Sequence, residues 1–347
     1  MSTEQRAYRA YIGSFTEAGG AGITVADVDR ATGALTPRYA TDEVANPSYL
    51  ALSPGGDVLY AVSETDDGAA AAFRTGADPA RPLTLLGAPV PVHGAAPTHL
   101  ALAAGHLLTA NYGSGSVSAL PVGDDGGLGE PTAVLRHEGS GPNRERQSEP
   151  HAHQVLPDPS GGWLLSVDLG ADAVWVYEPA GPRAHRKVRL RAGSGPRHLA
   201  FHPRGDRAYV VNELDPTVTV CRWDAASGTL EPLGETRVVP PGTEAATFPS
   251  EAVVSPDGRF VWVAGRGHDS VATLALDTPG DRMELVTTTP CGGHWPRDLA
   301  LDPSGSRLYV ANERSGEVTW FALDPTTGVP SRDGSLEAPA ASCVIFG

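Results

Sequence analysis

Arginine and glutamate recur at one fixed interval in two segments of the chain. The spacing from Arg197 to Glu213 is repeated from Arg297 to Glu313, and a third segment carries Arg266 at the position of the glutamate. Guanidinium groups bind carboxylates and phosphates through paired N–H donors. Several arginines at equivalent points of a repeat therefore predict a site for a small anionic ligand.

A further segment has histidine where these segments have arginine. Its Pro-x-Gly turn aligns with the turn that follows Arg197, and this alignment makes His153 the counterpart of that arginine. An unperturbed imidazole gains or loses a proton near neutral pH. The exchange of arginine for histidine predicts an acid-base group, with nearby His151 as the alternative candidate.

Other polar residues fall at the same two points of the repeat. Two antiparallel strands joined by a turn bring the start of one strand and the end of the other to the same edge, so these residues are expected to share one rim. Besides the residues above, the rim collects His198, Glu251, Asp298, Glu64, Asn111, Asp168, Asn212 and Asn312. A structural interpretation stays open: the asparagines and Asp168 suit turns and ties between strands, and the arginines could pair with neighbouring glutamates.

The segments that carry these residues share one pattern: a proline, a polar pair, an alternating apolar run, a tight turn and a second apolar run. The copies cover 46–73, 96–120, 149–177, 195–224, 248–277 and 295–324. A repeat near 50 residues with several strands per copy is typical of a β-propeller. Residues 10–29 match only the second half of the pattern, and 341–346 supply the missing first strand. We predict an all-β fold, one domain over 1–347, which is a seven-bladed propeller of four-stranded antiparallel blades closed by pairing of the N- and C-terminal strands.

Composition excludes several classes of function. The net charge of −15 argues against a nucleic-acid surface, which needs clustered lysine and arginine. No stretch approaches about 18 consecutive apolar residues, so no membrane span is expected. The N-terminal segment lacks the apolar core of a signal peptide, and the three cysteines lack a metal or redox spacing, which predicts a cytoplasmic protein with free thiols. A monomer is favoured, although nothing in the sequence reports on assembly directly.

Four motifs together resemble one known family. They are SEPHAHQV, GPRHLAFHP followed by YVVNEL, SPDGRFVWVAGRGHDS, and PRDLALDPSG followed by YVANE. In this order they are similar to the seven-bladed lactonases, which include propeller-type 6-phosphogluconolactonases and fungal carboxymuconate lactonising enzymes. The resemblance implies that His153, Arg197, Glu213 and Arg266 are catalytic. One departure is Gly265, where the repeat usually has Asn or Asp.

The expected activity is hydrolysis of a small anionic sugar lactone without a cofactor or metal, with 6-phosphogluconolactone as the leading substrate. Lactone opening needs a base for the attacking water, stabilisation of the oxyanion and an acid for the leaving alkoxide. His153 suits the proton transfers, and Glu213 is a second candidate base that a neighbouring arginine weakens. The predicted substrate-binding residues are Arg297, His151, His198, Asn212 and Glu251.

Three alternatives remain. A muconate-type cycloisomerase would use the same arginines to hold a di- or tricarboxylate. A metal-dependent lactonase would use Glu64, Asn111, Asp168 and Asn212 as oxygen ligands, although arginines on the same rim oppose a cation. A propeller that only binds another protein is the third, because fold alone does not imply catalysis.

Overall fold

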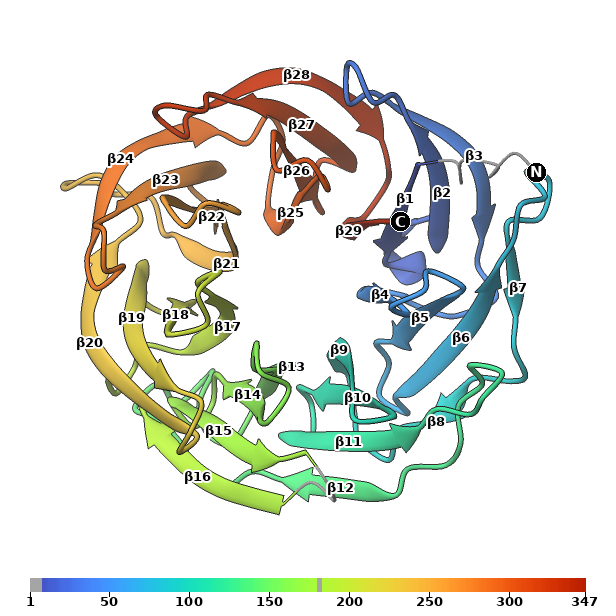
Figure 1. Cartoon of the computed structure of the whole chain (residues 1–347), viewed down its shortest axis with the longest axis horizontal. Helices are drawn as coiled ribbons and strands as arrows, with labels where there is room; N and C mark the ends of the chain where they lie inside the picture. Colours follow the sequence, from blue (N-terminus) through green and yellow to red (C-terminus); the bar gives the residue numbers. More distant parts are fainter. Residues whose placement is uncertain (1–7, 180–182) are drawn as a thin grey trace.

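Seven antiparallel sheets surround a central channel in the computed structural model, which describes residues 8–179 and 183–347 (Figure 1). Six sheets have four strands, and the remaining sheet has a fifth strand, β8 (Val90–Pro91), paired with its third strand. The predicted all-β propeller is thereby confirmed. Residues 1–7, which include the start of the segment used to argue against a signal peptide, lie outside the described residues.

Each sheet is one blade, and its first strand in the order below lines the channel. The first four blades are β29 (Ala341–Phe346), β1 (Arg9–Ser14), β2 (Ile23–Val28), β3 (Leu35–Thr41); β4 (Leu50–Leu52), β5 (Val58–Ser63), β6 (Ala69–Thr75), β7 (Leu83–Leu85); β9 (Pro97–Ala103), β10 (His106–Asn111), β11 (Ser116–Pro121), β12 (Ala133–Arg136); and β13 (Ala152–Pro157), β14 (Leu164–Asp168), β15 (Ala173–Glu178), β16 (Arg183–Arg189). The last three are β17 (Pro196–Phe201), β18 (Arg207–Asn212), β19 (Thr217–Asp224), β20 (Thr229–Arg237); β21 (Phe248–Val254), β22 (Phe260–Arg266), β23 (Ser270–Leu276), β24 (Met283–Pro290); and β25 (Pro296–Leu301), β26 (Arg307–Asn312), β27 (Glu317–Leu323), β28 (Pro330–Glu337).

The C-terminal strand closes the ring, as the repeat analysis predicts. β29 pairs antiparallel with β1, and the register places Tyr11 opposite Ile345 and Ile12 opposite Val344. The innermost strand of this blade therefore comes from the opposite end of the chain. Closure gives every blade two neighbours and leaves no open edge between the first and last blades.

Apolar side chains fill the spaces between adjacent blades. Between the fourth and fifth blades, Val167 and Val176 on one sheet pack with Leu199 and Val210 on the next. The short runs rich in valine and aromatic residues form strands because both sheet faces are buried in this stack. The core is thus a series of layers between blades, and the channel is left for polar side chains.

Aromatic residues on second strands tie neighbouring blades together. Each donates a hydrogen bond of 2.7 to 3.2 Å to a glycine carbonyl in the outer hairpin of the next blade: Tyr60 to Gly126, Tyr209 to Gly280, Trp262 to Gly328 and Tyr309 to Gly33. These glycines have φ between 70° and 84°, the left-handed region that glycine adopts without strain. The recurring hairpin glycines in the sequence therefore serve the junctions between blades.

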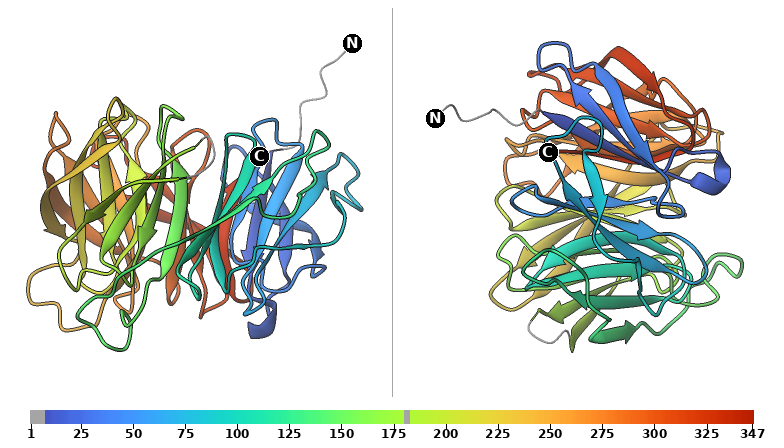
Figure 2. Two further views of the ribbon diagram at one scale, coloured as in Figure 1. Left: turned by 90° about the horizontal axis from the view of Figure 1, so that it is seen from below. Right: turned by 90° about the vertical axis from the view of Figure 1, so that its right-hand side faces the viewer.

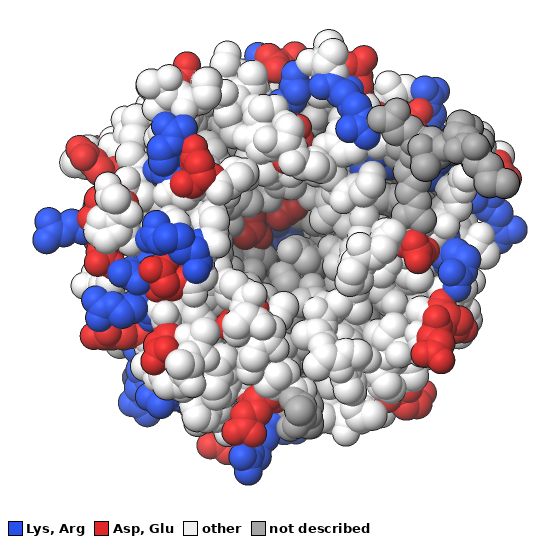
Figure 3. All heavy atoms as spheres, viewed as in Figure 1, with Lys and Arg blue, Asp and Glu red and all other residues white. Residues whose placement is uncertain are grey.

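The ring has two distinct ends. A short 3-10 helix, η1 (Thr16–Ala18), follows β1 and marks one end in the side views (Figure 2). The starts of the channel strands lie at this end, because β29 begins beside the end of β1. Figure 3 shows the opposite end, where the centre of the ring is hollowed and acidic atoms are visible inside the hollow.

Candidate functional site

A β-bulge at the start of the channel strands aims the predicted site residues inward. In the fifth blade the register shifts between Pro196 and His198, which leaves Arg197 as the extra residue. The same shift occurs at His153 in the fourth blade and at Arg297 in the seventh. Bulges redirect side chains and are common beside active sites. The predicted equivalence of His153 and Arg197 is confirmed by this shared register.

Glu213 is the centre of a buried cluster of arginines. Its Oε2 lies 2.7 Å from Nη2 of Arg266 and 3.2 Å from Nε of Arg197, and its Oε1 accepts a 2.6 Å hydrogen bond from Nη2 of Arg146. The Glu213 side chain is 5% exposed. One carboxylate therefore faces three guanidinium groups and cannot neutralise them all. The cluster keeps a surplus of positive charge, which favours an anionic ligand.

The pKa values of this cluster follow from that imbalance. Burial would raise the pKa of Glu213, but Arg266, Arg197 and Arg146 outweigh it and hold the pKa at about 2. Burial, together with Arg266, lowers the pKa of Arg197 to about 9. Glu213 therefore stays ionised at neutral pH and is a poor base. Its carboxylate pairs with the three arginines, and its role as proton acceptor stays a prediction that the low pKa weakens.

Backbone carbonyls fix two of the arginines from behind. Arg197 donates from Nη1 to the carbonyl oxygen of Ser250 at 2.5 Å. Arg266 donates from Nε to the carbonyl of Phe248 at 3.0 Å, and its guanidinium lies 5.4 Å from the centre of the Trp295 ring. Both guanidinium groups are thus oriented before any ligand binds, which reduces the ordering cost of binding.

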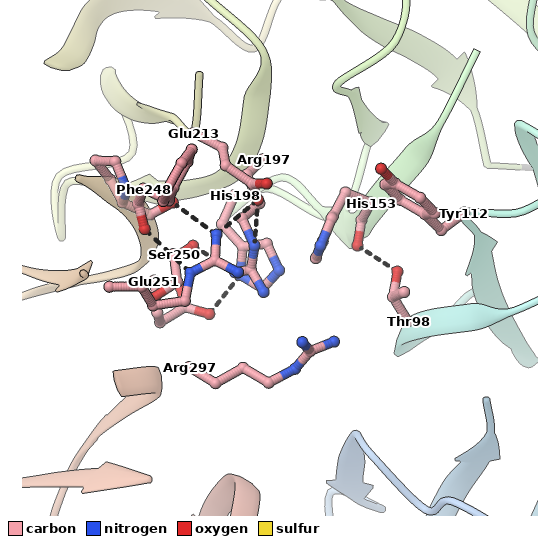
Figure 4. A network of polar contacts seen from close by, with 12 residues as sticks. Thr98, Tyr112, His153, Arg197, His198, Glu213, Phe248, Ser250, Glu251 and Arg297 are labelled. Atoms are coloured by element: carbon pink, nitrogen blue, oxygen red, sulfur yellow. Dashed lines mark hydrogen bonds and ion pairs between the residues drawn. The ribbon is translucent and has the colours of Figure 1, made fainter. Parts of the chain in front are cut away.

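His153 faces the arginine cluster across the channel (Figure 4). The residue is 6% exposed, and among the described residues its Nδ1 has no hydrogen-bond partner. Burial, and then the charge of Arg197, lower the pKa of His153 well below its ordinary value. The imidazole is therefore neutral at pH 7, and a free ring nitrogen is available in a buried polar space. The free nitrogen can accept a proton, and the lowered pKa makes His153 a weaker base than an exposed imidazole.

A second imidazole lies beside the first and has a carboxylate behind it. The ring centres of His153 and His198 are 5.1 Å apart, and Nδ1 of His198 is hydrogen-bonded to Glu251. Nε2 of His198 is buried without a partner in the described part of the chain. A carboxylate on one ring nitrogen fixes the tautomer and directs the other nitrogen toward the cavity.

Glu251 in turn contacts Asp298. Both carboxyl groups are buried and each influences the pKa of the other, and Asp298 accepts a 2.9 Å bond from the backbone N–H of Val344. Burial raises the pKa of Glu251 to about 7, against the influence of Arg197. Burial and Glu251 raise the pKa of Asp298 well above its ordinary value. The pair thus retains a proton beneath the arginine cluster near neutral pH.

Arg297 extends from the seventh blade toward the space between His153 and His198 (Figure 4). It lies 3.1 Å from Glu313 and 3.5 Å from Glu64, and its guanidinium is 4.9 Å from the centre of the Phe15 ring. Burial would lower the pKa of Arg297, but Glu64 and Glu313 outweigh it and raise it. Arg297 therefore stays charged and joins the same cavity, as the repeat predicts.

Other predicted residues have structural contacts. Asn212 donates from Nδ2 to the hydroxyls of Thr217 and Thr219 at 2.9 Å, within its own blade. Asn111 and Asn312 make equivalent bonds to the third strands of their own blades. The amide nitrogen of Asn212 is thus used inside the blade, while its Oδ1 is buried without a partner among the described residues, and substrate binding by Asn212 stays a prediction. The bonds within the blades support the structural interpretation of the asparagines.

His151 and Asp168 also take part in local packing. The His151 ring stacks on Tyr112 with centres 4.4 Å apart, and its Nδ1 lies 2.9 Å from the Tyr112 carbonyl. Asp168 lies 2.5 Å from Nδ1 of His137, which was not among the predicted residues, and accepts the backbone N–H of His151. Of the two candidate histidines, His153 is therefore the one with a free buried nitrogen beside the arginines.

Two neighbours of the cavity were missed by the sequence analysis. Arg146 lies in the loop 137–150, which is longer than the corresponding connection 238–247, and it also bonds Tyr112 Oη at 3.3 Å. His99 lies between Tyr49 and His198, with ring centres 4.1 and 5.4 Å away. A signal for His99 was present, since the letters HLA occur at 99–101 and again at 198–200. For Arg146 the only signal was the length of the loop, because long loops in compact folds are often functional.

Within residues 8–179 and 183–347, no group of three or more His, Cys, Asp and Glu is arranged to hold a metal ion. In the same ranges, none of the helices has the length and apolarity to cross a membrane. Cys221, Cys291 and Cys343 are buried and free. The oxygen ligands of the metal-dependent alternative are divided between blades, with Asn111 and Asn212 bonded within their own sheets.

Comparison with known proteins agrees with the fold. The sequence model of the family described as "Lactonase, 7-bladed beta-propeller" matches residues 9–346. The chain belongs to this family, and it is an enzyme of the lactonase class. A relative in Bacillus subtilis, described as 6-phosphogluconolactonase, is 32% identical over 98% of each chain.

Solved structures give the same result. A putative 6-phosphogluconolactonase from Bacteroides fragilis is 29% identical, with a TM-score of 0.91 over 100% of this chain and 99% of the other. A periplasmic gluconolactonase from Pseudomonas aeruginosa is 31% identical, with a TM-score of 0.91 over 98% of each chain. The resemblance noted in the sequence is thus confirmed at the level of the family.

Proposed function

We propose that this lactonase hydrolyses a small anionic sugar lactone, with 6-phosphogluconolactone as the leading substrate. The observation that carries the proposal is the opposition of a neutral, unpartnered His153 to a cluster of arginines with surplus positive charge. Hydrolysis of an anionic ester requires a neutral base to accept a proton from water and fixed positive charge to bind the substrate and stabilise the oxyanion. The Bacillus subtilis relative described as 6-phosphogluconolactonase supports this choice of substrate.

In the proposed reaction, His153 takes a proton from water as the water oxygen bonds to the lactone carbonyl carbon. The carbonyl oxygen becomes an oxyanion, and Arg197 stabilises it from the opposite side of the cavity. Collapse of this intermediate breaks the bond between the carbon and the ring oxygen. The proton on His153 passes to the leaving alkoxide, which remains attached to the product. The new carboxylic acid then ionises in water, so His153 ends the cycle neutral.

Glu213 and His198 support these steps without taking a proton from water. Glu213 holds the arginines, and its low pKa keeps the carboxylate charged throughout. His198, oriented by Glu251, presents Nε2 to the same space as His153 and can hydrogen-bond the substrate or the attacking water. We keep the expectations of a single domain and of a cytoplasmic location as part of this proposal, although the Pseudomonas relative is described as periplasmic.

The proposal is tested by turnover of a panel containing 6-phosphogluconolactone, gluconolactone and carboxymuconates. The wild type is expected to open the phosphorylated lactone, and His153→Ala should lower kcat by a factor of roughly 10²–10⁴. His151→Ala is the matched control, because His151 packs on Tyr112 beside the cavity, and it should lower kcat much less. Full activity in His153→Ala would remove this residue from the mechanism. Turnover of muconates but of no lactone would overturn the hydrolase assignment.

A further inference from the structure

Arg146 contacts Glu213 from a loop that is fixed by a buried glutamine next to it in the sequence. The loop 137–150 connects β12 to β13, and Gln147, which is fully buried, donates from Nε2 to the carbonyl of Leu169 at 2.8 Å. Its side-chain carbonyl accepts the N–H of Asn143 at 3.2 Å, and its backbone carbonyl accepts the N–H of Gly141 at 2.9 Å. The loop is thus fixed at its centre, directly beside Arg146.

One atom of Arg146, Nη2, lies between a residue of the third blade and a residue of the fifth. It bonds Tyr112 Oη, at the end of the second strand of the third blade, and Glu213, at the end of the second strand of the fifth blade. His153 belongs to the blade between them, and Figure 4 places it between Tyr112 and Glu213. Nη2 of Arg146 therefore joins residues of the two blades that flank the blade of His153.

Of the three arginines on Glu213, Arg146 is the one that solvent reaches. Its side chain is 37% exposed, against 3% for Arg197 and 7% for Arg266. Both of its bonds, to Tyr112 and to Glu213, come from Nη2. Neither contact uses Nη1 or Nε, and an arginine has five N–H donors arranged for two-point binding of an anion.

We propose that Arg146 binds the distal anionic group of the substrate and so selects phosphorylated over neutral lactones. This inference rests on the proposed function. If the lactone carbonyl lies beside His153, the opposite end of a sugar acid can reach the partly exposed side chain of Arg146. A phosphate loses much solvation when it is buried. Binding the phosphate to Arg146, whose side chain is 37% exposed, costs less desolvation free energy than binding it to the buried Arg197.

The test compares Arg146→Gln with Arg144→Gln, a control with the same charge change at an exposed position of the same loop. KM and kcat are measured for 6-phosphogluconolactone and for gluconolactone. Loss of a charge-assisted hydrogen bond corresponds to roughly a 10- to 100-fold weaker interaction. Arg146→Gln should raise KM for the phosphorylated lactone by about that factor and change KM for gluconolactone by less than about threefold. Arg146→Lys, which keeps the charge but loses the fork, should fall between.

Equal changes for the two lactones in Arg146→Gln, or a result matching that of Arg144→Gln, would overturn the selection role. Calorimetric binding of 6-phosphogluconate and gluconate makes the same comparison without turnover. An inactive wild type would therefore refute the proposed function, and the binding data would still decide the role of Arg146. Circular dichroism and the thermal midpoint identify a variant whose loop has failed to fold, in which case Arg146→Lys carries the decision.

Discussion

Replacing Glu213 by glutamine should destabilise the folded protein at neutral pH. The pKa of Glu213 falls from its ordinary value of 4.5 to about 2, because three arginines outweigh the effect of burial. This difference corresponds to roughly 3 kcal/mol of stability. Removal of one member of a buried ion pair costs about 3–5 kcal/mol, which is the same order. We therefore expect Glu213→Gln to lower the free energy of unfolding at pH 7 by about 3 kcal/mol.

The direction of the pKa shift determines how the stabilisation by Glu213 changes with pH. Because the folded pKa of Glu213 is depressed, its contribution is present above pH 4.5 and is lost as the pH falls toward 2. The difference between wild type and Glu213→Gln should accordingly shrink as the pH falls below 4.5. Phosphate should stabilise Glu213→Gln more than the wild type, since it can occupy the place of the missing carboxylate among the arginines.

Urea unfolding followed by fluorescence measures these effects. Glu313→Gln is the matched control: Glu313 pairs with Arg297 at 3.1 Å, but its side chain is 22% exposed, so the cost should be about 1 kcal/mol or less. If Glu213→Gln unfolds within about 1 kcal/mol of the wild type at pH 7 and shows the same pH dependence, the arginines do not need Glu213. The account of the cluster as a preformed anion site would then fail.

Two further predictions concern the buried proton and the closure of the ring. Glu251→Gln should gain stability relative to the wild type, by roughly 2–4 kcal/mol, as the pH rises from 4.5 through about 7. The reason is that the wild type loses stability as the pH rises, because the Glu251 carboxyl ionises more readily in the unfolded chain than in the folded protein. Urea unfolding at several pH values measures this difference. Parallel pH profiles of the two proteins would contradict it. Deletion of 341–347 removes β29, so the first blade loses its channel strand and the ring should not form a cooperative fold, as near-UV circular dichroism and thermal unfolding would report. A sharp transition near the wild-type midpoint would show that closure is dispensable.

The repeat in the sequence was sufficient to predict the architecture. Its period specified the blades, and the partial copy at 10–29 required a strand from 341–346, which the pairing of β29 with β1 confirms. It also predicted that His153 occupies the position in the fourth blade that Arg197 occupies in the fifth, because equivalent positions in a repeat share one backbone geometry. Information carried by the periodic pattern could therefore be read without coordinates.

Contacts between blades could not be read in this way. The repeat placed His198, Glu251 and Asp298 at one rim, but their order as a hydrogen-bonded chain depends on which blades are neighbours and how they rotate. The third arginine on Glu213 comes from a loop without a repeat register, so Arg146 had no predicted place. Asn212 shows a further limit, since the sequence did not reveal that its amide nitrogen bonds residues of its own blade.

The central claim is that His153 and the arginine cluster act on opposite sides of one bound lactone. A crystal structure with 6-phosphogluconate, the product of the leading substrate, tests it most directly. We predict that the carboxylate formed from the lactone carbonyl lies within hydrogen-bond distance of both His153 and Arg197, with the phosphate toward Arg146. A product bound outside the channel, or bound there with no contact to His153, would contradict the account.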